Sequence, residues 1–221
     1  MQDQRRMRVR QLASEYRQQG NATGWFEVLY NEAQGDERAI VWADMACNPN
    51  LLAWLEREQV RGEGRRALVV GCGLGDDAEE LARRGFQVTA FDISPTAIAW
   101  CQRRFPTSSV TYLAADLLNA PEDWTQGFDF VFEAYTLQVL PPDLRARAVP
   151  ALAKFVVSDG RLLIICRGRE PEEDPGVLPL PLTRDDFVTF PAAGLHLVNF
   201  EDYFEQDESP TRRFRVLYQR S

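Results

Sequence analysis

A short glycine-rich turn that follows an apolar run constrains this chain more than any other feature. Residues 67–70, Ala-Leu-Val-Val, are too few for a helix and suit a central parallel strand covered on both faces. The next five residues, 71–75, read Gly-Cys-Gly-Leu-Gly and carry little side-chain bulk. Their backbone can bend sharply and approach a ligand closely. We therefore expect a ligand site at this turn.

The residues after the turn predict a helix and a second strand. Asp76 and Asp77 open a helix whose small and apolar residues share one face, and Gly85 ends it. Residues 86–91 form a second apolar strand, and Asp92 follows at its carboxyl end, about twenty residues after the first glycine. A carboxylate at that place can accept hydrogen bonds from both hydroxyl groups of a ribose. The whole stretch is thus expected to be one nucleotide-binding unit.

The spacing of the glycines separates two classes of cofactor. In a dinucleotide fingerprint the third glycine comes five positions after the first, which lets a helix amino terminus approach a pyrophosphate. Here it comes four positions after the first, and Asp76 and Asp77 would repel a pyrophosphate. The pattern G-x-G-x-G followed by an acidic residue resembles motif I of the class I S-adenosylmethionine-dependent methyltransferases, whose cofactor has no phosphate. An NAD(P)-dependent oxidoreductase and a glycine turn without any ligand are the alternatives.

Composition and charge argue against several other classes of protein. The chain has 221 residues, of which 45% are hydrophobic and 26% charged, as expected for one globular domain. Its net charge of −8 argues against a nucleic-acid surface. No apolar run approaches the length of a membrane span, and the first residues lead into no signal-peptide core, so we expect a cytoplasmic protein. The four cysteines are widely spaced and indicate neither a disulfide framework nor a metal site.

Hydrophobic runs and turn residues predict the remaining elements. We expect further strands at 110–115, 128–132, 161–167, 195–204 and 212–219, and helices at 2–19, from Asn48, from Ser94 to 105, at 142–157 and at 183–193. This order resembles the seven-stranded sheet of the class I methyltransferases. The resemblance implies an α/β, Rossmann-like fold whose sheet is mostly parallel and ends in an antiparallel hairpin.

We expect a single methyltransferase domain over residues 1–221. A helical cap or lid would occupy residues 1–62, and the cofactor-binding core residues 63–221. The sequence favours a monomer without deciding the oligomeric state.

The segment before the glycine turn resembles a narrower group of enzymes. Residues 41–51, which include Trp42, read V-W-A-D-x-x-x-x-P-x-L, and Trp25 and Phe26 precede them. This resembles the segment before motif I in the thiopurine, thiol and halide methyltransferases, where a similar stretch closes over the substrate. The resemblance implies that Trp42 borders the cofactor and substrate cavity and that Trp25 and Phe26 form part of an apolar lid. Simple core packing is the alternative for these aromatic residues.

Further cofactor contacts are expected at the carboxyl ends of the strands. Asp92 begins a D-x-S-x-x-A-I pattern that many class I methyltransferases share. Asp116 ends the third strand, where family members place an acid near the adenine amino group; a turn or cap role is the alternative. The resemblance thus implies that S-adenosylmethionine is bound by Trp42, Gly71, Cys72, Gly73, Gly75, Asp92, Ile93, Asp116, Leu117 and Glu133.

The chain departs from the family pattern at two positions. Motif I usually begins with an acidic residue two positions before the first glycine, where this chain has Val69. The thiopurine members have an aspartate-arginine pair at the end of the fourth strand, where this chain has Glu133 and Ala134. Thiopurine specificity is therefore not implied, and we expect methyl transfer to a small molecule, such as a thiol or another soft nucleophile. A catalytically inactive cofactor-binding protein of the same fold is the alternative.

Methyl transfer from a sulfonium neutralises the positive charge of the donor, so an apolar cavity that positions both reactants helps more than a strong acid or base. Glu133 and Tyr135 are the candidate catalytic residues, because either can take the proton of a thiol or orient the acceptor. Arg167 and Arg169, at the end of the fifth strand, can instead hold an acidic substrate.

Overall fold

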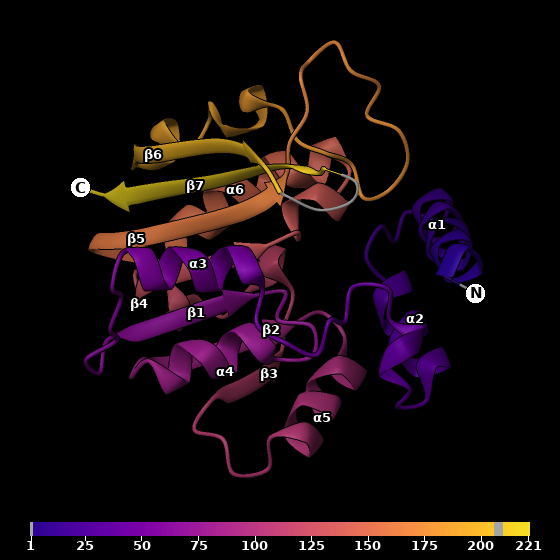
Figure 1. The fold of residues 1–221 in the computed structure, drawn as a ribbon, viewed down its shortest axis with the longest axis horizontal. Coiled ribbons are helices and arrows are strands. Elements are labelled where there is room, and N and C mark those ends of the chain that lie inside the picture. Colours follow the sequence, from indigo (N-terminus) through magenta and orange to yellow (C-terminus); the bar gives the residue numbers. More distant parts are fainter. Residues whose placement is uncertain (1, 206–209) are drawn as a thin grey trace.

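The computed structural model describes residues 2–205 and 210–221, which contain one sheet with helices on both faces (Figure 1). Its strands are β1 Arg66–Val70, β2 Gln87–Asp92, β3 Thr111–Ala114, β4 Phe128–Ala134, β5 Val156–Arg167, β6 Leu195–Phe204 and β7 Arg212–Arg220. They stand in the order β3-β2-β1-β4-β5-β7-β6. Strands β1 to β5 pair in parallel, whereas β7 runs antiparallel to both β5 and β6. The predicted fold class is confirmed.

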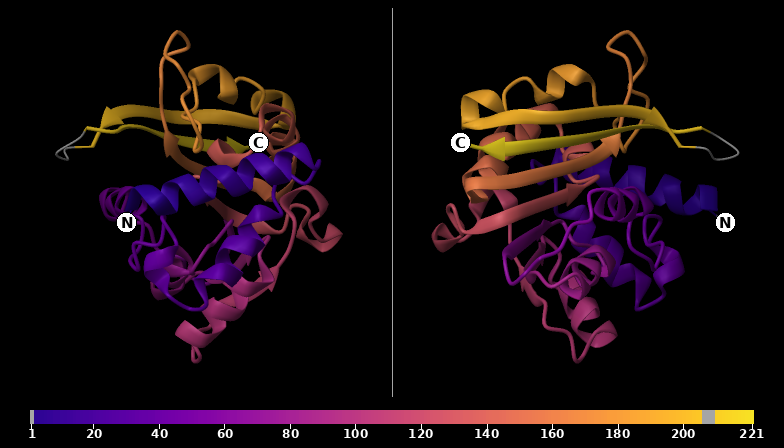
Figure 2. Two further views of the ribbon diagram at one scale, coloured as in Figure 1. Left: turned by 90° about the vertical axis from the view of Figure 1, so that its right-hand side faces the viewer. Right: turned by 60° about the vertical axis from the view of Figure 1, so that its left-hand side comes forward.

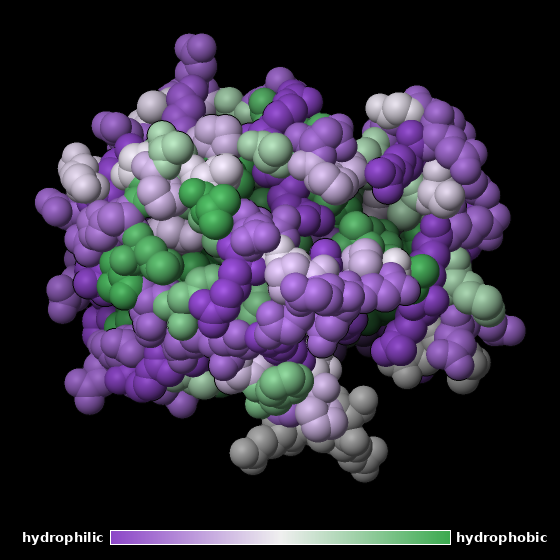
Figure 3. Space-filling view, turned by 90° about the horizontal axis from the view of Figure 1, so that it is seen from above, coloured by the Kyte–Doolittle hydropathy of each residue, from purple (hydrophilic) through white to green (hydrophobic). Residues whose placement is uncertain are grey.

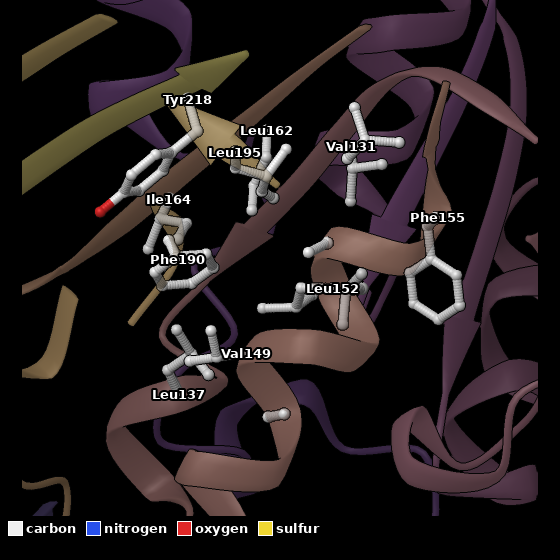
Figure 4. Close-up of a cluster of buried hydrophobic side chains, with 14 of the residues drawn as sticks. Val131, Leu137, Val149, Leu152, Phe155, Leu162, Ile164, Phe190, Leu195 and Tyr218 are labelled. Carbon is white, nitrogen blue, oxygen red and sulfur yellow. The ribbon is translucent and has the colours of Figure 1, made fainter. Parts of the chain in front are cut away.

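Six α-helices of the described chain accompany the sheet: α1 Gln2–Gln18, α2 Trp25–Ala33, α3 Pro49–Arg57, α4 Asp76–Arg83, α5 Pro95–Arg104 and α6 Pro142–Phe155. Apolar residues of α3, α4 and α5 pack on one face of the sheet. Helix α6 covers the other face, where its side chains meet those of β4 and β5 (Figure 4). Strands buried on both faces account for the continuous apolar runs in the sequence.

Local capping chemistry places the starts of two helices where the sequence predicts them. The Asn48 side chain accepts hydrogen bonds from the backbone N–H groups of Asn50 and Leu51 at the start of α3. The Ser94 hydroxyl accepts one from the Ala97 N–H at the start of α5. In both helices a proline follows the cap, at a position that has no helical hydrogen bond to donate.

Helices α1 and α2 lie at the carboxyl edge of the parallel strands, and α1 runs across that edge (Figure 2). Their buried residues, which include Trp25, Leu29 and Tyr30, form a cluster of their own with Leu74 of the glycine turn and Trp100 of α5. Helix α3 instead belongs to the layer that packs directly on the sheet. The division into a cap at 1–62 and a core at 63–221 stays a prediction.

One predicted helix is wrong. The helix expected at 183–193 is replaced by two 3₁₀ turns, Arg184–Phe187 and Pro191–Ala193. Pro191 explains the break, because a proline in a continuous helix has no N–H to donate and would clash with the carbonyl of Phe187. That carbonyl instead accepts a hydrogen bond from the Tyr218 hydroxyl.

The fifth strand is also longer than predicted. It begins at Val156, directly after α6, and passes through Gly160, which the sequence placed in a turn. An irregularity in the pairing of β4 with β5, between Phe128 and Phe130, accommodates the additional residues. Within the described residues, none of the helices combines the length and the apolar character that crossing a bilayer requires.

Candidate functional site

The carboxyl ends of three neighbouring strands bring the predicted site residues to one edge. Val70, the last residue of β1, pairs with Phe91 of β2 on one side and with Glu133 of β4 on the other. The glycine turn, Asp92 and the end of β4 therefore emerge next to each other. Open α/β sheets bind their ligands at this edge.

The glycine turn has a backbone that other residues would not adopt easily. Gly71 and Gly75 have φ angles of 63° and 92°, which L-residues rarely take. A Cβ at Gly75 would also lie 2.6 Å from the Tyr112 hydroxyl, and one at Gly71 would collide with the Thr136 hydroxyl. Both glycines are thus required by conformation and by space. Cys72 and Gly73 between them are half-buried.

Asp92 fastens the glycine turn to the end of β2. Its two carboxylate oxygens accept hydrogen bonds from the backbone N–H groups of Gly73 and Ser94, each at 3.0 Å. Burial raises the pKa of Asp92 to about 6, and these backbone donors oppose the rise. Each carboxylate oxygen can accept more than one hydrogen bond. The carboxylate can therefore hold the turn and still receive a ligand hydroxyl.

The two aspartates that open α4 have partners of different kinds. Arg104 of α5 pairs with Asp76 through two hydrogen bonds of 2.8 Å. Asp77 accepts a hydrogen bond of 2.7 Å from the backbone N–H of Asn48, and burial raises its pKa to about 6. Arg104 compensates the charge of Asp76, so repulsion of a pyrophosphate rests mainly on Asp77. The hydrogen bond from Asn48 to Asp77 ties the segment before α3 to the start of α4, directly after the glycine turn.

The predicted aromatic lid lies against the glycine turn, and it includes a residue that the sequence did not single out. The indole N–H of Trp42 donates to the hydroxyl of Tyr30 at 3.0 Å. The rings of Trp25 and Phe26 stack with centroids 3.8 Å apart, and each meets the Trp42 ring edge-on. A Cβ on Gly73 would lie 3.4 Å from the Tyr30 hydroxyl, which places Tyr30 directly beside the turn.

Tyr30 stays protonated in this setting. Burial, together with the charge of Asp92, raises its pKa well above the usual value. Its hydroxyl accepts from Trp42 and donates to no acceptor among residues 2–205 and 210–221. The only hint of this residue in the sequence is its place in an aromatic segment.

Glu27 of α2 holds the cap onto α5, which the sequence also did not indicate. Its carboxylate accepts hydrogen bonds from the hydroxyls of Ser94 and Thr96, at 2.5 and 2.6 Å, and from the Thr96 N–H at 3.2 Å. Burial acts to raise the pKa of Glu27, but these bonds outweigh it and hold the pKa below its usual value. The cap is therefore anchored two residues from Asp92.

The residues expected near an adenine have local roles as well. Asp116 caps a 3₁₀ turn, with one oxygen accepting from the Leu118 N–H and the other from the Asn119 amide. The capping alternative is thus realised, and contact with adenine stays a prediction. The Leu117 side chain is buried in the core, whereas Ile93 is half-buried after Asp92.

Glu133 and Tyr135, the candidate catalytic residues, have different surroundings. The Glu133 side chain is fully buried, and one of its oxygens accepts a 2.9 Å hydrogen bond from the Thr136 N–H. Burial raises its pKa to about 8, so it is neutral near pH 7. Tyr135 is half-buried and has a left-handed backbone with a φ of 65°. The Arg213 guanidinium lies 5.3 Å from its ring centroid.

The two arginines expected to hold an acidic substrate do not act alike. Arg169 donates to the backbone carbonyls of four residues of the loop that follows, Glu170, Pro171, Glu173 and Pro181. Its guanidinium therefore shapes that loop. Arg167 is half-buried at the end of β5, and its guanidinium forms no hydrogen bond or ion pair within the described part of the chain.

One surface cavity lies away from the carboxyl edge of the strands. Its volume is about 660 Å³, and it is lined by Glu56, Gln59, Arg61, Arg83 and Arg84, at the opposite, amino-terminal edge of the strands. It carries none of the predicted chemistry. Seen from above, hydrophobic side chains lie recessed between α1 and the main body of the molecule (Figure 3). In the described ranges no group of three His, Cys, Asp or Glu residues is placed to hold a metal ion.

Comparison with known proteins agrees with this arrangement. Residues 67–160 match a protein-family model described as a methyltransferase domain. The ubiquinone biosynthesis O-methyltransferase of Alkalilimnicola ehrlichii is 34% identical over 112 residues, which are 50% of this chain and 44% of that protein. The enzyme of the same name from Azotobacter vinelandii is 30% identical over 57% of this chain and 53% of its own length. The chain thus spans about half the length of the curated relatives it matches.

Solved structures share the fold across most of the chain. The Burkholderia thailandensis 1,6-didemethyltoxoflavin-N1-methyltransferase with bound S-adenosylhomocysteine matches with a TM-score of 0.68 and 19% identity, covering 89% of this chain and 87% of that one. A structure described under the conversion of a disulfide bond into a thioacetal group during echinomycin biosynthesis has a TM-score of 0.69 and 20% identity, over 88% and 92%.

These matches agree with the prediction of a class I S-adenosylmethionine-dependent methyltransferase: residues 67–160 are similar to a methyltransferase domain, and the solved structures share the fold. They favour neither an oxidoreductase nor an inactive cofactor-binding protein. The sequence relatives described above are O-methyltransferases, so the resemblance to the thiopurine, thiol and halide group is not confirmed.

Proposed function

We propose that this chain, whose residues 67–160 form a methyltransferase domain, transfers a methyl group from S-adenosylmethionine to a small-molecule acceptor at the carboxyl edge of its sheet. The observation that carries the proposal is the joint geometry of the glycine turn and Asp92, which hold each other at the ends of β1 and β2. The bound cofactor would supply a methyl group activated on a positively charged sulfur.

The residues at this edge fit a cofactor with ribose hydroxyls and no phosphate. Asp92 offers carboxylate oxygens that can still accept hydrogen bonds, and Asp77 beside the turn is acidic. Gly71 and Gly75 allow the sharp bend of the turn, and the half-buried backbone of Cys72 and Gly73 between them is proposed to approach the cofactor. In this proposal Ile93, Asp116 and Leu117 border the adenine.

The aromatic cap would exclude water from the reacting groups. Trp42 and Tyr30 join the cap to the turn, and Glu27 joins it to α5. In methyl transfer to an anion, the charges of the reactants are partly neutralised in the transition state. Excluding water therefore destabilises the reactants more than the transition state and lowers the barrier. Trp42 is thus proposed to border the cofactor and the acceptor.

Glu133 and Tyr135 are proposed to act in different ways. Glu133 is neutral near pH 7 and bonds the backbone of Thr136, so it serves as a positioning residue for the turn that carries Tyr135. Tyr135 lies at the carboxyl edge and can touch the acceptor. Burial raises the pKa of Tyr135, so its hydroxyl keeps its own proton and can orient the acceptor through a hydrogen bond.

The finer identity of the acceptor also belongs to the proposal. A thiol or another soft nucleophile is consistent with a site that positions its reactants and has no strong base. The relatives that match the domain methylate oxygen according to their names, so hydroxyl compounds belong beside thiols among the candidates.

Turnover with a panel of acceptors tests the proposal. The protein is incubated with S-adenosylmethionine and with thiols, phenols, amines and carboxylic acids, and the release of S-adenosylhomocysteine is followed. We expect release that depends on an acceptor and is reduced at least tenfold in Trp42→Ala, whereas the exposed Arg103→Gln on α5 keeps wild-type activity. Binding of the cofactor without turnover of any acceptor would contradict methyl transfer.

A further inference from the structure

Two guanidinium groups face each other where β5 ends and β7 begins. Arg167 and Arg213 are register partners in the antiparallel pair of these strands. Arg213 donates to Glu205 through one terminal nitrogen at 2.6 Å. Its Nε and its other terminal nitrogen are buried, and neither has a partner among the described residues. The Arg167 guanidinium is also unbonded there, so this pair holds several unused donors.

In the part of the chain that the structure describes, the groups beside the pair supply little negative charge. Glu205 is the acid beside it, and that carboxylate already accepts from both Arg213 and the Asn50 amide. Burial, the charge of Arg213 and the charge of Arg6 together lower the pKa of Arg167, while Tyr135 and Glu205 act against this. Within residues 2–205 and 210–221, Arg167 and Arg213 thus share the carboxylate of Glu205, in a chain whose net charge is −8.

This local excess of positive charge has a physical cost. Buried donors without acceptors lose their hydration and gain nothing in return, and like charges at close range repel each other. An anion with two coplanar oxygens relieves both effects, because guanidinium groups bind carboxylates through paired hydrogen bonds. The Tyr135 ring, which lies against Arg213, offers an apolar surface for the body of such a molecule.

Arg167 and Arg213 lie at the same edge of the sheet as the glycine turn, within reach of an acceptor bound there. Strand β4 separates β1, which carries the glycine turn, from β5. At about 4.8 Å between neighbouring strands, β5 with Arg167 lies about 10 Å, and β7 with Arg213 about 14 Å, along the edge from β1. Tyr135 at the end of β4 stands between the glycine turn and the pair.

We propose that the methyl acceptor carries a carboxylate and that Arg167 and Arg213 bind it, an inference that rests on the proposed methyl transfer at the same edge. The carboxylate at the amino-acid end of S-adenosylmethionine has the same chemistry, and the experiment separates the two sources. Arg167 and Arg213 then determine specificity for acidic over neutral acceptors.

Calorimetry with benzoate and benzamide tests this pair. The two probes are titrated into the protein with and without saturating S-adenosylhomocysteine, using the wild type, Arg167→Gln and Arg103→Gln. Arg167 has no bond to lose within the described chain, and Arg103 is an exposed arginine on α5 that controls for the change of net charge. Arg213→Gln provides a second variant, with thermal unfolding to show that it is folded.

We expect benzoate to bind the wild type and Arg103→Gln, and to bind Arg167→Gln at least tenfold more weakly; benzamide should bind none of them at comparable concentration. The Kd of S-adenosylhomocysteine should stay within twofold in all three proteins. Equal binding of benzoate by the wild type and Arg167→Gln, or no binding of benzoate to the wild type at millimolar concentration, would overturn the proposal. So would a tenfold loss of S-adenosylhomocysteine affinity in Arg167→Gln, which would assign the pair to the cofactor.

A second measurement uses turnover. For an accepted acid and its methyl ester, Arg167→Gln should raise the KM of the acid at least tenfold and leave that of the ester unchanged. If the KM values of the acid and the ester change equally, Arg167 and Arg213 do not bind the carboxylate of the acceptor. Failure of the wild type to bind S-adenosylhomocysteine would instead refute the proposed function, while the benzoate titration without cofactor would still report on the arginine pair.

Discussion

Replacing Glu133 with glutamine tests whether the buried acid at the end of β4 is neutral near pH 7. One oxygen of this carboxyl group accepts from the Thr136 N–H at 2.9 Å, and the other is buried without a partner in the described chain. Burial raises its pKa from 4.5 to about 8. The folded protein therefore keeps a proton there that the unfolded chain releases above its own lower pKa.

The sign and size of the effect follow from this difference. Between the two pKa values the unfolded state binds fewer protons, so the free energy of unfolding falls as the pH rises. At about 1.4 kcal/mol for each pKa unit, the wild type should lose about 5 kcal/mol across the window. Glutamine cannot ionise, and its carbonyl can still accept from Thr136. We expect Glu133→Gln to be about 1 kcal/mol less stable at about pH 5 and about 2 to 4 kcal/mol more stable at about pH 9.

Urea unfolding at several pH values measures this crossing of the two stability curves. Glu63→Gln is the matched control, because the substitution is the same and Glu63 is exposed. Its stability should follow that of the wild type at every pH. A constant difference between the wild type and Glu133→Gln from acid to alkaline pH would refute the reasoning, since it would mean that Glu133 has the same pKa in both states.

Three further predictions concern the site and its supports. Gly75→Ala should lower the free energy of unfolding by about 1 to 3 kcal/mol. Adding Tyr112→Phe to this variant should recover part of the loss, because it removes the hydroxyl that the new Cβ meets; urea unfolding measures both changes. Trp42→Phe and Tyr30→Phe should each cost about 1 kcal/mol, and a double-mutant cycle should show that the losses are not additive. Arg169→Gln should speed proteolysis within residues 170–181, because its guanidinium binds four carbonyls of that loop; cleavage at an unchanged rate would contradict this role.

Much of the fold could be predicted because its signals are local. The glycine turn, the capping residues Asn48 and Ser94 and the apolar strands each act within a few residues of the chain, and each is found where the sequence places it. Their order then determines the sheet, since parallel strands require crossover connections. The helix predicted at 183–193 shows the limit of such signals. Thr183 does form the predicted cap, but Pro191 prevents a continuous helix, and two 3₁₀ turns form instead.

The contacts that complete the candidate site are long-range, and no local pattern announces them. Glu27 reaches Ser94 across 67 positions. The opposition of Arg167 and Arg213 depends on the register of β5 with β7. The sequence singled out Arg167 and Arg169 equally, because only the folded chain shows that Arg169 is occupied by its own loop.

Binding of S-adenosylhomocysteine, compared with NAD and NADP, tests the central claim most directly. Calorimetry on the wild type and on Asp92→Ala compares the three ligands under one set of conditions. The account predicts micromolar binding of S-adenosylhomocysteine alone, and loss of that binding in Asp92→Ala, which removes the carboxylate next to the glycine turn. Binding of a dinucleotide only, or an S-adenosylhomocysteine affinity that Asp92→Ala leaves unchanged, would contradict it.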